Sequence, residues 1–321
     1  MSLKSGNSSS WLLGVCVCAG IVIASGAKAA DAQLNTQLQA STAQSCTDSN
    51  WTKPLLLQLA RKGFEVADAE RDALAERLAA CLAEADPELR DGIGFTGLSH
   101  WLRAGALSEG RIRSLYINLS QDVSSGKNSS SGVYLPFAVL TLSELARVDR
   151  VKPYLTDNQR GQLVTLATSH MHGISDYRGF DDAMGWRHQV AHAADLLLQL
   201  GLNPALDGVA IQALVNAIDN QISPKGHFYI FGEPERLARP VLYAMLREDI
   251  PEAFWREKIS IWTKPVHIEG WEPAFSSSKG LAERHNRRAF LGALLLAMSA
   301  SQNTSLQTLT PLVRDAFNQL P

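Results

Sequence analysis

The stretch from Asp176 to Leu200, DYRGFDDAMGWRHQVAHAADLLLQL, holds the densest set of side chains in the chain that could do chemistry. If its second half is an α-helix, side chains three and four residues apart lie on one face. Four polar residues have this spacing, namely His188, His192, Asp195 and Gln199. Asp195 is the only charged residue between positions 189 and 200, whereas a surface helix normally has a broad charged face. We therefore expect this stripe to face packed protein or an enclosed polar cavity.

Three residues of the stripe have the spacing of a metal site. Two histidines four residues apart can share an ion, and Asp195 one turn later could complete a set with His188 and His192. The spacing resembles that of zinc proteases, but Gln189 stands where their mechanism needs a glutamate base, so that mechanism is excluded. Two other interpretations remain: the histidines contact a ligand without a metal, or internal hydrogen bonds satisfy them. A divalent metal is the one cofactor that the pattern leaves open.

Further polar motifs stand near the starts of other expected helices, and their residues complete the set of candidate ligand contacts. A base for a metal-assisted reaction would have to come from one of these motifs, in the form of Glu233 or Glu235. The pair Arg90-Asp91 occupies a similar position in an earlier helix. The candidates outside the stripe are Asp176, Arg178, Trp186, Glu233, Glu235, Arg236, Arg284, His285 and Asn286.

Each of these motifs also has a purely structural interpretation. An Asp-x-Arg pair at a helix entry commonly fixes a loop through charge-assisted hydrogen bonds, which would be the role of Asp176 and Arg178. Trp186 could stack on a ligand or pack into the core. The two glutamates of GEPER could simply favour the helix dipole, and the RHN motif could satisfy carbonyl groups of neighbouring loops. The residues alone leave both interpretations open.

Net charge and missing motifs exclude several classes of function. Only Lys4 and Lys28 are charged within residues 1–29, so the chain without that segment has a net charge of −4, against −2 for the whole sequence. Such a balance offers no electrostatic surface for nucleic acid or an anionic membrane, and neither partner is expected. The sequence also lacks a Gly-x-Ser-x-Gly motif and a phosphate-binding loop.

Residues 1–29 have the pattern of a secretory signal peptide. Lys4 gives a short positive region, positions 11–24 form an apolar segment, and Ala27-Lys28-Ala29 is a small-x-small cleavage site. The apolar segment is too short to span a membrane. We therefore expect cleavage after Ala29, a periplasmic or secreted protein, and no membrane span in the mature chain. Residues 30–50 are polar and predict a flexible leader.

Cys46 and Cys81 are the only cysteines after the predicted cleavage site. In an oxidising compartment they could form a disulfide, which would stabilise the fold by about 3–4 kcal/mol in the chain-entropy model. The alternative is a partly buried free thiol at Cys81, which stands in an apolar helical run. The sequence does not decide between the two.

From position 51 onward the hydrophobic periodicity is helical, and no segment convincingly alternates with the period of a strand. Start and stop signals are frequent, such as the capping box Thr156-x-x-Gln159 and the helix-ending glycines Gly63 and Gly105. The expected helices span about 52–63, 68–84, 86–105, a segment from 108, 134–149, 156–172, 185–200, 207–222, 233–249, 252–263, 281–300 and 306–319.

Taken in order, these helices form six pairs, and the last four intervals between first helices are 48 to 51 residues. This regularity predicts an all-α solenoid of the HEAT or armadillo type, in a single helical-repeat domain over residues 51–321. Closure into an α/α toroid is the alternative. Stacked repeats would bring the motifs of successive first helices into one groove, with free helix N–H groups added. Such a groove would suit a polar or anionic ligand.

The same motifs carry a resemblance to a known family. The segments ADPELRDGIGF, PFAVLTLSELARVDR, DYRGFDDAMGWRHQVAHAADLLLQLGLNP, GEPERLARPVLY and RHNRRAFL resemble, in order over about residues 52–300, the bacterial domain-of-unknown-function family 2785. The resemblance implies an all-helical, repeat-like domain without an established activity. One departure is Gln189, where many relatives have a small residue after the first histidine of the central motif.

Together these observations predict an exported helical-repeat protein that binds a small polar molecule or a peptide in a groove lined by the motif residues. A hydrolase that uses the same residues, with or without a metal ion, is the alternative of a different class. A scaffold whose motifs only tie the repeats together is the third.

Overall fold

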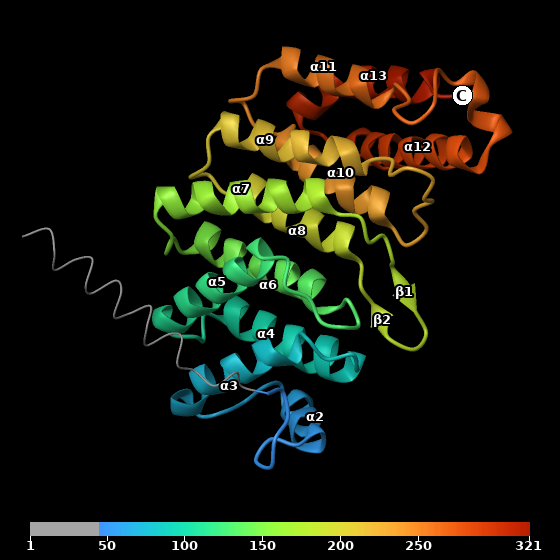
Figure 1. The fold of residues 1–321 in the computed structure, drawn as a ribbon. Helices are drawn as coiled ribbons and strands as arrows, with labels where there is room; N and C mark the ends of the chain where they lie inside the picture. The colour runs from blue at the N-terminus through green and yellow to red at the C-terminus, as the bar shows by residue number, and fades with distance from the viewer. Residues whose placement is uncertain (1–44) are drawn as a thin grey trace, which may run out of the picture. The chain divides into compact units, whose positions relative to one another are not determined.

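Twelve α-helices, α2 to α13, make up most of residues 45–321, the part of the chain that this computed structural model describes (Figure 1). The predicted signal peptide and the leader up to residue 44 lie outside the described residues. The helices are α2 (Lys53–Arg61), α3 (Asp68–Cys81), α4 (Thr96–Ala104), α5 (Glu109–Ser124), α6 (Tyr134–Val151), α7 (Asp157–Gly173), α8 (Gln189–Gly201), α9 (Gly208–Ile218), α10 (Glu233–Ala244), α11 (Glu252–Trp262), α12 (Ser278–Ser299) and α13 (Thr304–Gln319).

The chain is thus all-α, as predicted, and its helices follow one another in pairs that pack in two rows. The first helices form one row, in which α4 packs on α6, α6 on α8, α8 on α10 and α10 on α12. In the second row α3 packs on α5, α5 on α7 and α7 on α9, and α11 packs on α13. The pairs follow the sequence from α2 and α3 at one end to α12 and α13 at the other (Figure 1).

Local signals in the sequence explain several helix ends. Thr156 and Gln159 form the predicted capping box at the start of α7. Gly105 ends α4 in the left-handed conformation that glycine adopts without a steric cost. Three short helices lie between the long ones, namely the π-helix η1 (Glu88–Phe95), which continues directly into α4, and the 3-10 helices η2 (Asp219–Gln221) and η3 (Glu272–Ser276).

A small strand pair corrects the expectation of helix throughout. Strands β1 (Phe180–Asp181) and β2 (Gly185–Trp186) pair antiparallel, with Phe180 opposite Trp186. Between them, a carboxylate oxygen of Asp181 accepts the N–H groups of Ala183 and Met184, which closes the turn. The helix expected over 185–200 therefore begins only at Gln189. Two-residue strands are too short to show the alternating pattern by which strands are recognised in a sequence.

The folded region also includes residues 45–50, which the sequence assigned to the leader. Cys46 is buried and forms a disulfide with Cys81 of α3, one of the two alternatives that the sequence left open. Arg77 holds the same segment by donating to the carbonyl oxygen of Ser45 and to the carboxylate of Asp48. These contacts explain why a polar segment is ordered here although it has few apolar side chains.

Helix α8 lies in the middle of the row of first helices, and Asp195 is its only charged residue. Helix α8 packs against α6, α7, α9 and α10, so most of its residues from Gln189 to Leu200 are buried. This matches the shortage of charged residues in its sequence. Among the described residues, no helix combines the length and the apolar character that crossing a membrane requires.

Candidate functional site

A cleft of about 740 Å³ opens on the row of first helices. Five of the predicted residues meet in its lining: Trp186, His188, His192, Asp195 and Arg236. The stripe on α8 thus faces a polar cavity, as its lack of charge suggested. The remaining lining residues come from η1, α4, α6, α8, α10 and the loop before α10, and they are Asp91, Phe95, Thr96, Arg103, Phe137, Leu140, Ser143, Glu144, Leu198, Gln199, Phe231 and Arg239.

His188 stands at the point where the strand pair passes into α8. It is the N-cap of the helix, with φ of 51° and ψ of 40°, a left-handed conformation that costs a non-glycine residue about 1–2 kcal/mol. Its N–H donates to the carbonyl oxygen of Arg178, and its ring stacks on Trp186 with 4.7 Å between centroids. Within residues 45–321 only Phe64 is another non-glycine residue with positive φ. Such strain persists where surrounding contacts enforce it, as is common at functional sites.

His192 presents a neutral imidazole in a defined tautomer. Its Nδ1 lies 3.1 Å from the carbonyl oxygen of Pro136 in the first turn of α6. Because a carbonyl oxygen only accepts hydrogen bonds, Nδ1 carries the proton and Nε2 keeps its lone pair. Burial, together with the charges of His188 and Arg236, lowers the pKa of His192 to about 3. The ring is therefore neutral at pH 7, and its Nε2 can accept a hydrogen bond.

His188 is also neutral and has an unused nitrogen. Burial, with the charge of Arg236 acting in the same direction, lowers the pKa of His188 to about 4. Its Nε2 lies 3.6 Å from a carboxylate oxygen of Glu233, too far for a hydrogen bond, and has no hydrogen-bond partner among the described residues. Glu233 itself is buried outside the cleft lining, and it accepts the N–H of Phe231. This nitrogen is thus itself buried, on the side of the ring toward Glu233.

Asp195 and Arg236 join α8 to α10 within the cleft. The guanidinium of Arg236 donates from both Nε and Nη2 to the two carboxylate oxygens, with 3.0 Å from Nε to Oδ1. Burial nevertheless raises the pKa of Asp195, although the charges of Arg236 and Arg239 act to lower it. Both residues of this pair line the cleft, and the two hydrogen bonds from Arg236 engage both carboxylate oxygens of Asp195.

Sequence reasoning missed a second arginine–carboxylate pair in the cleft. Arg103 of α4 donates from Nε to Glu144 of α6 at 2.9 Å, and its Nη2 contacts the other carboxylate oxygen. A signal existed, because Glu144 is the only charged residue between positions 134 and 146, as Asp195 is in α8. Arg239, one turn after Arg236, was also missed. It makes no hydrogen bond or ion pair with any residue in the 45–321 range.

Arg90 of η1 supports the cleft from below its surface. Its side chain is fully buried, donates to the carbonyl oxygens of Ala85 and Met184, and lies 4.8 Å over the ring of Phe137. It thereby ties η1 to the turn of the strand pair. The neighbouring Asp91 lines the cleft, and burial raises the pKa of its carboxyl more than the charge of Arg90 lowers it.

Two predicted residues, Asp176 and Arg178, pair with each other outside the cleft. The guanidinium of Arg178 donates to both carboxylate oxygens of Asp176, and this interaction lowers the pKa of Asp176. The N–H of Arg178 also donates to the same carboxylate. Both side chains are partly exposed, so their contacts fix the loop before the strand pair.

The last predicted motif, residues 284–286, lies inside α12, six residues after the helix begins, and not in the cleft. Asn286 is fully buried, accepts the N–H of Tyr229 and donates to the carbonyl oxygen of His227. A ring nitrogen of His285 lies 3.2 Å from the carbonyl oxygen of Tyr229, and Arg284 stacks on the ring of Phe275. This motif therefore holds the loop before α10. Glu235 is exposed and lines a separate cavity between α10 and α12.

The side chains of His188, His192 and Asp195 are not arranged as metal ligands in this structure. Within residues 45–321, no three histidine, cysteine, aspartate or glutamate side chains come together as an ion would require. Nδ1 of His192 is engaged by Pro136, and Asp195 is engaged by Arg236. The three-ligand set expected from the spacing is therefore not assembled, because local partners orient two of its members.

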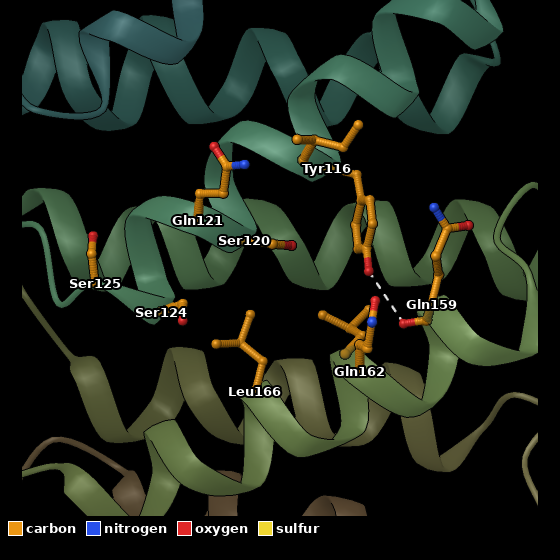
Figure 2. Close-up of a pocket in the computed structure, with 10 residues that line it drawn as sticks. Tyr116, Ser120, Gln121, Ser124, Ser125, Gln159, Gln162 and Leu166 are labelled. Atoms are coloured by element: carbon orange, nitrogen blue, oxygen red, sulfur yellow. Dashed lines mark hydrogen bonds between the residues drawn. The ribbon is translucent and has the colours of Figure 1, made fainter. Parts of the chain in front are cut away.

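A second cavity, of about 480 Å³, lies on the other row of helices, between α5 and α7 (Figure 2). Tyr116 reaches across it and donates from its hydroxyl to the carbonyl oxygen of Gln159. The labelled side chains around it are hydroxyls, amides and a leucine. Its lining contains no aspartate, glutamate, lysine or arginine: it consists of Tyr116, Ile117, Ser120, Gln121, Ser124, Ser125, Gln159, Gln162, Leu163 and Leu166.

Comparison with known proteins adds a family but no activity. One family model, described as "Protein of unknown function (DUF2785)", matches residues 123–296, more than half of the chain. These residues include every predicted site residue from Asp176 to Asn286. No curated protein and no solved structure matches the chain.

Proposed function

We propose that this chain, which belongs to the DUF2785 family of proteins of unknown function, binds a small polar molecule or a peptide through an anionic group in the cleft of α8. The observation that carries the proposal is the meeting of residues from separate motifs in one cavity. Glu144, the segment from Trp186 to His192, and Arg236 are each more than 40 residues apart in the sequence. They nevertheless line the same cleft of about 740 Å³. Packing alone would not require this set of residues to share a cavity.

The charges of the cleft suggest which group a ligand presents. Arg103 and Arg236 are each paired with a carboxylate, whereas Arg239 has no such partner among the described residues. An exposed guanidinium beside a satisfied pair can bind a carboxylate or phosphate through two parallel hydrogen bonds. We infer that Arg239 is the primary anion contact.

The neutral histidines and Trp186 would bind the uncharged part of the ligand. Nε2 of His192 offers an acceptor, and Nε2 of His188 lacks a partner. Trp186 is 37% exposed and is held in place by stacking on His188, so its free surface is available to a planar or apolar group. The ligand would therefore combine an anionic end with donor groups and a flat or apolar portion.

The test is calorimetric titration of the purified protein with succinate and with inorganic phosphate. We expect Arg239→Gln to weaken binding about 10-fold or more, because a charge-assisted pair of hydrogen bonds is lost. Arg256→Gln on α11 is the matched control, since Arg256 is exposed and lies outside the cleft lining. The proposal fails if neither anion binds, or if the two variants bind equally well.

We propose a HEAT- or armadillo-like solenoid as the arrangement of the six helix pairs. The packing of each first helix on the next supports it, as does the placement of the first and last pairs at opposite ends of the stack (Figure 1). An experimental structure in which α2 and α3 contact α12 and α13 would instead indicate the toroid.

Export is likewise a proposal. The disulfide between Cys46 and Cys81 supports it, because such bonds persist chiefly in oxidising compartments. Mass spectrometry of the protein from its natural host should give an N-terminus at Ala30. An intact Met1 in the cell interior would contradict export.

A hydrolase is the second candidate function, and one observation favours it. Burial raises the pKa values of both Asp91 and Asp195, which line the same cleft as two neutral imidazoles. Shifted pKa values gathered in one cleft are typical of acid–base catalysis. Turnover of ester or glycoside substrates that is lost in both Asp91→Asn and Asp195→Asn would support this candidate. Turnover that survives both changes would exclude these carboxyls as the catalytic groups.

A further inference from the structure

Two smaller cavities adjoin the cleft, and each shares an arginine with it. One, of about 250 Å³, lies at the C-terminal ends of α4 and α6 and shares Arg103 with the cleft. The other, of about 310 Å³, lies between α10 and α12 and shares Arg239. The cleft is therefore the middle one of three cavities, joined to its two neighbours at Arg103 and Arg239.

The cavity at α10 and α12 has largely apolar walls, and the cavity at α4 and α6 combines apolar with charged side chains. The cavity at α4 and α6 includes Val148 and Val151, and the cavity at α10 and α12 includes Tyr243 and Leu296. Three of these side chains are exposed: Val151 by 64%, Tyr243 by 41% and Leu296 by 75%. Apolar surface at both ends of a polar cleft is the arrangement found where a partner buries its own apolar groups.

Unpaired positive charge runs along the same row. Arg147 and Lys152 line the first end cavity and Arg239 lines the second, and none of the three makes an ion pair within the described residues. Each end cavity also has one carboxylate. Glu109 at the first is paired with Arg113, whereas Glu235 at the second makes no ion pair among the described residues. Because the three carboxylates of the cleft are each paired with an arginine, these three unpaired cations outnumber Glu235, and they are complementary to a ligand with more than one carboxylate.

We propose that the three cavities are one binding groove for an extended peptide that carries both acidic and apolar side chains. This inference rests on the proposed binding function of the cleft and names its ligand class. An acidic polysaccharide would also satisfy the arginines, but it has no apolar side chains to fill the end cavities. A single small anion would occupy only the central cleft.

The experiment compares defined probes by calorimetry on the purified protein. The first probe is an acetylated and amidated octapeptide of alternating leucine and glutamate, and the second replaces each leucine with serine. We expect the leucine peptide to bind at least about 10-fold more tightly, because each buried leucine contributes that much or more. Oligogalacturonate and succinate are the comparison ligands.

Variants in the end cavities separate this inference from the proposed function. We expect Val151→Ser and Leu296→Ser to weaken binding of the leucine peptide several-fold and to leave succinate binding unchanged. Val209→Ser on α9, an equally exposed apolar residue outside the groove, is the matched control. Succinate binding that depends on Arg239, with no gain from leucine, would overturn the peptide groove and leave the cleft function standing. Tighter binding of oligogalacturonate than of the peptide would also overturn it, in favour of a glycan.

Discussion

The cleft on the first helices and the cavity between α5 and α7 are both sizeable, at about 740 Å³ and 480 Å³, but they differ sharply in charge. The cleft is lined by three aspartates or glutamates and three arginines, among them the pairs Arg103–Glu144 and Arg236–Asp195. The cavity between α5 and α7 has only hydroxyl, amide and apolar side chains (Figure 2). The cleft therefore has charged walls, and the cavity between α5 and α7 has uncharged ones.

The difference is informative because withdrawing a charge from water destabilises a fold, even when a partner is present. A cavity left over from helix packing is expected to have neutral walls, as the cavity between α5 and α7 does. The cleft instead holds carboxyls whose pKa values burial raises and imidazoles whose pKa values it lowers. This contrast agrees with the proposed binding role of the cleft, and it can be tested through stability and binding of variants.

The largest effect should come from Arg90, the buried arginine beneath the cleft. Replacing it in Arg90→Leu leaves the carbonyl groups of Ala85 and Met184 without donors, and we expect a loss of about 4 kcal/mol in the free energy of unfolding. Urea denaturation measures it. The same change in Arg256→Leu, on the exposed surface of α11, should cost less than about 0.5 kcal/mol. Equal losses would show that Arg90 is not a special support of the cleft.

Acid should destabilise the protein through the two cleft histidines. Below their ordinary pKa of 6.5 the unfolded chain takes up a proton at each, whereas the native pKa values are about 4 for His188 and about 3 for His192. The unfolded state therefore binds more protons, and stability falls as the pH decreases from about 6.5 toward those values. Between pH 7 and pH 5 we expect a loss of about 2 kcal/mol per histidine.

Comparison of His192→Gln with His170→Gln sharpens this prediction. Burial also lowers the pKa of His170 to about 4, but this residue lies on α7, outside the cleft lining. Its side chain is more exposed than that of His192. Urea unfolding at pH 7 and pH 5 should show a smaller pH dependence in both variants, because both native pKa values lie below 5. An unchanged pH dependence in His192→Gln would mean that the pKa of His192 is the same in the native and unfolded states.

The helix pairs and the centre of the site could be predicted from the sequence for a common physical reason. Helix periodicity and caps such as Thr156 are local, so they can be read from neighbouring residues. The scarcity of charge in α8 is also local, and it correctly indicated that His192 and Asp195 face something other than open water. The same reading applied to α6 would have found Glu144.

The remaining features depend on contacts between segments distant in sequence. The left-handed backbone of His188 follows from the strand pair before it, and Asn286 holds a loop 57 residues earlier in the chain. The sequence grouped Arg284, His285 and Asn286 with the cleft because they stand near the expected start of a first helix, as His188 does. Their loop contacts show that a similar position in successive helix pairs does not fix what a side chain touches.

A smaller effect is expected from the ion pair between α8 and α10. Because Asp195 and Arg236 remain partly exposed, we expect Asp195→Ala to cost about 1–2 kcal/mol. A double-mutant cycle with Arg236→Ala measures their coupling. The exposed pair Glu252–Arg256, four residues apart on α11, is the matched reference and should couple by about 0.3–0.5 kcal/mol. A loss well above 2 kcal/mol at Asp195 would favour a scaffold role, because the pair would then serve stability first.

The smallest effect on stability should come from a change in the uncharged cavity between α5 and α7. This change tests most directly whether charged walls distinguish the cleft from that cavity. Gln162 lines that cavity from α7 and is one of its labelled side chains (Figure 2). Gln162→Ala removes no charge and no hydrogen bond within the described residues, so we expect a change of less than about 0.5 kcal/mol in the free energy of unfolding. Succinate binding by calorimetry should match that of the unmodified protein. If this variant weakened succinate binding as much as Arg239→Gln does, the charged side chains of the cleft would not determine binding. The cleft would then not be the binding site.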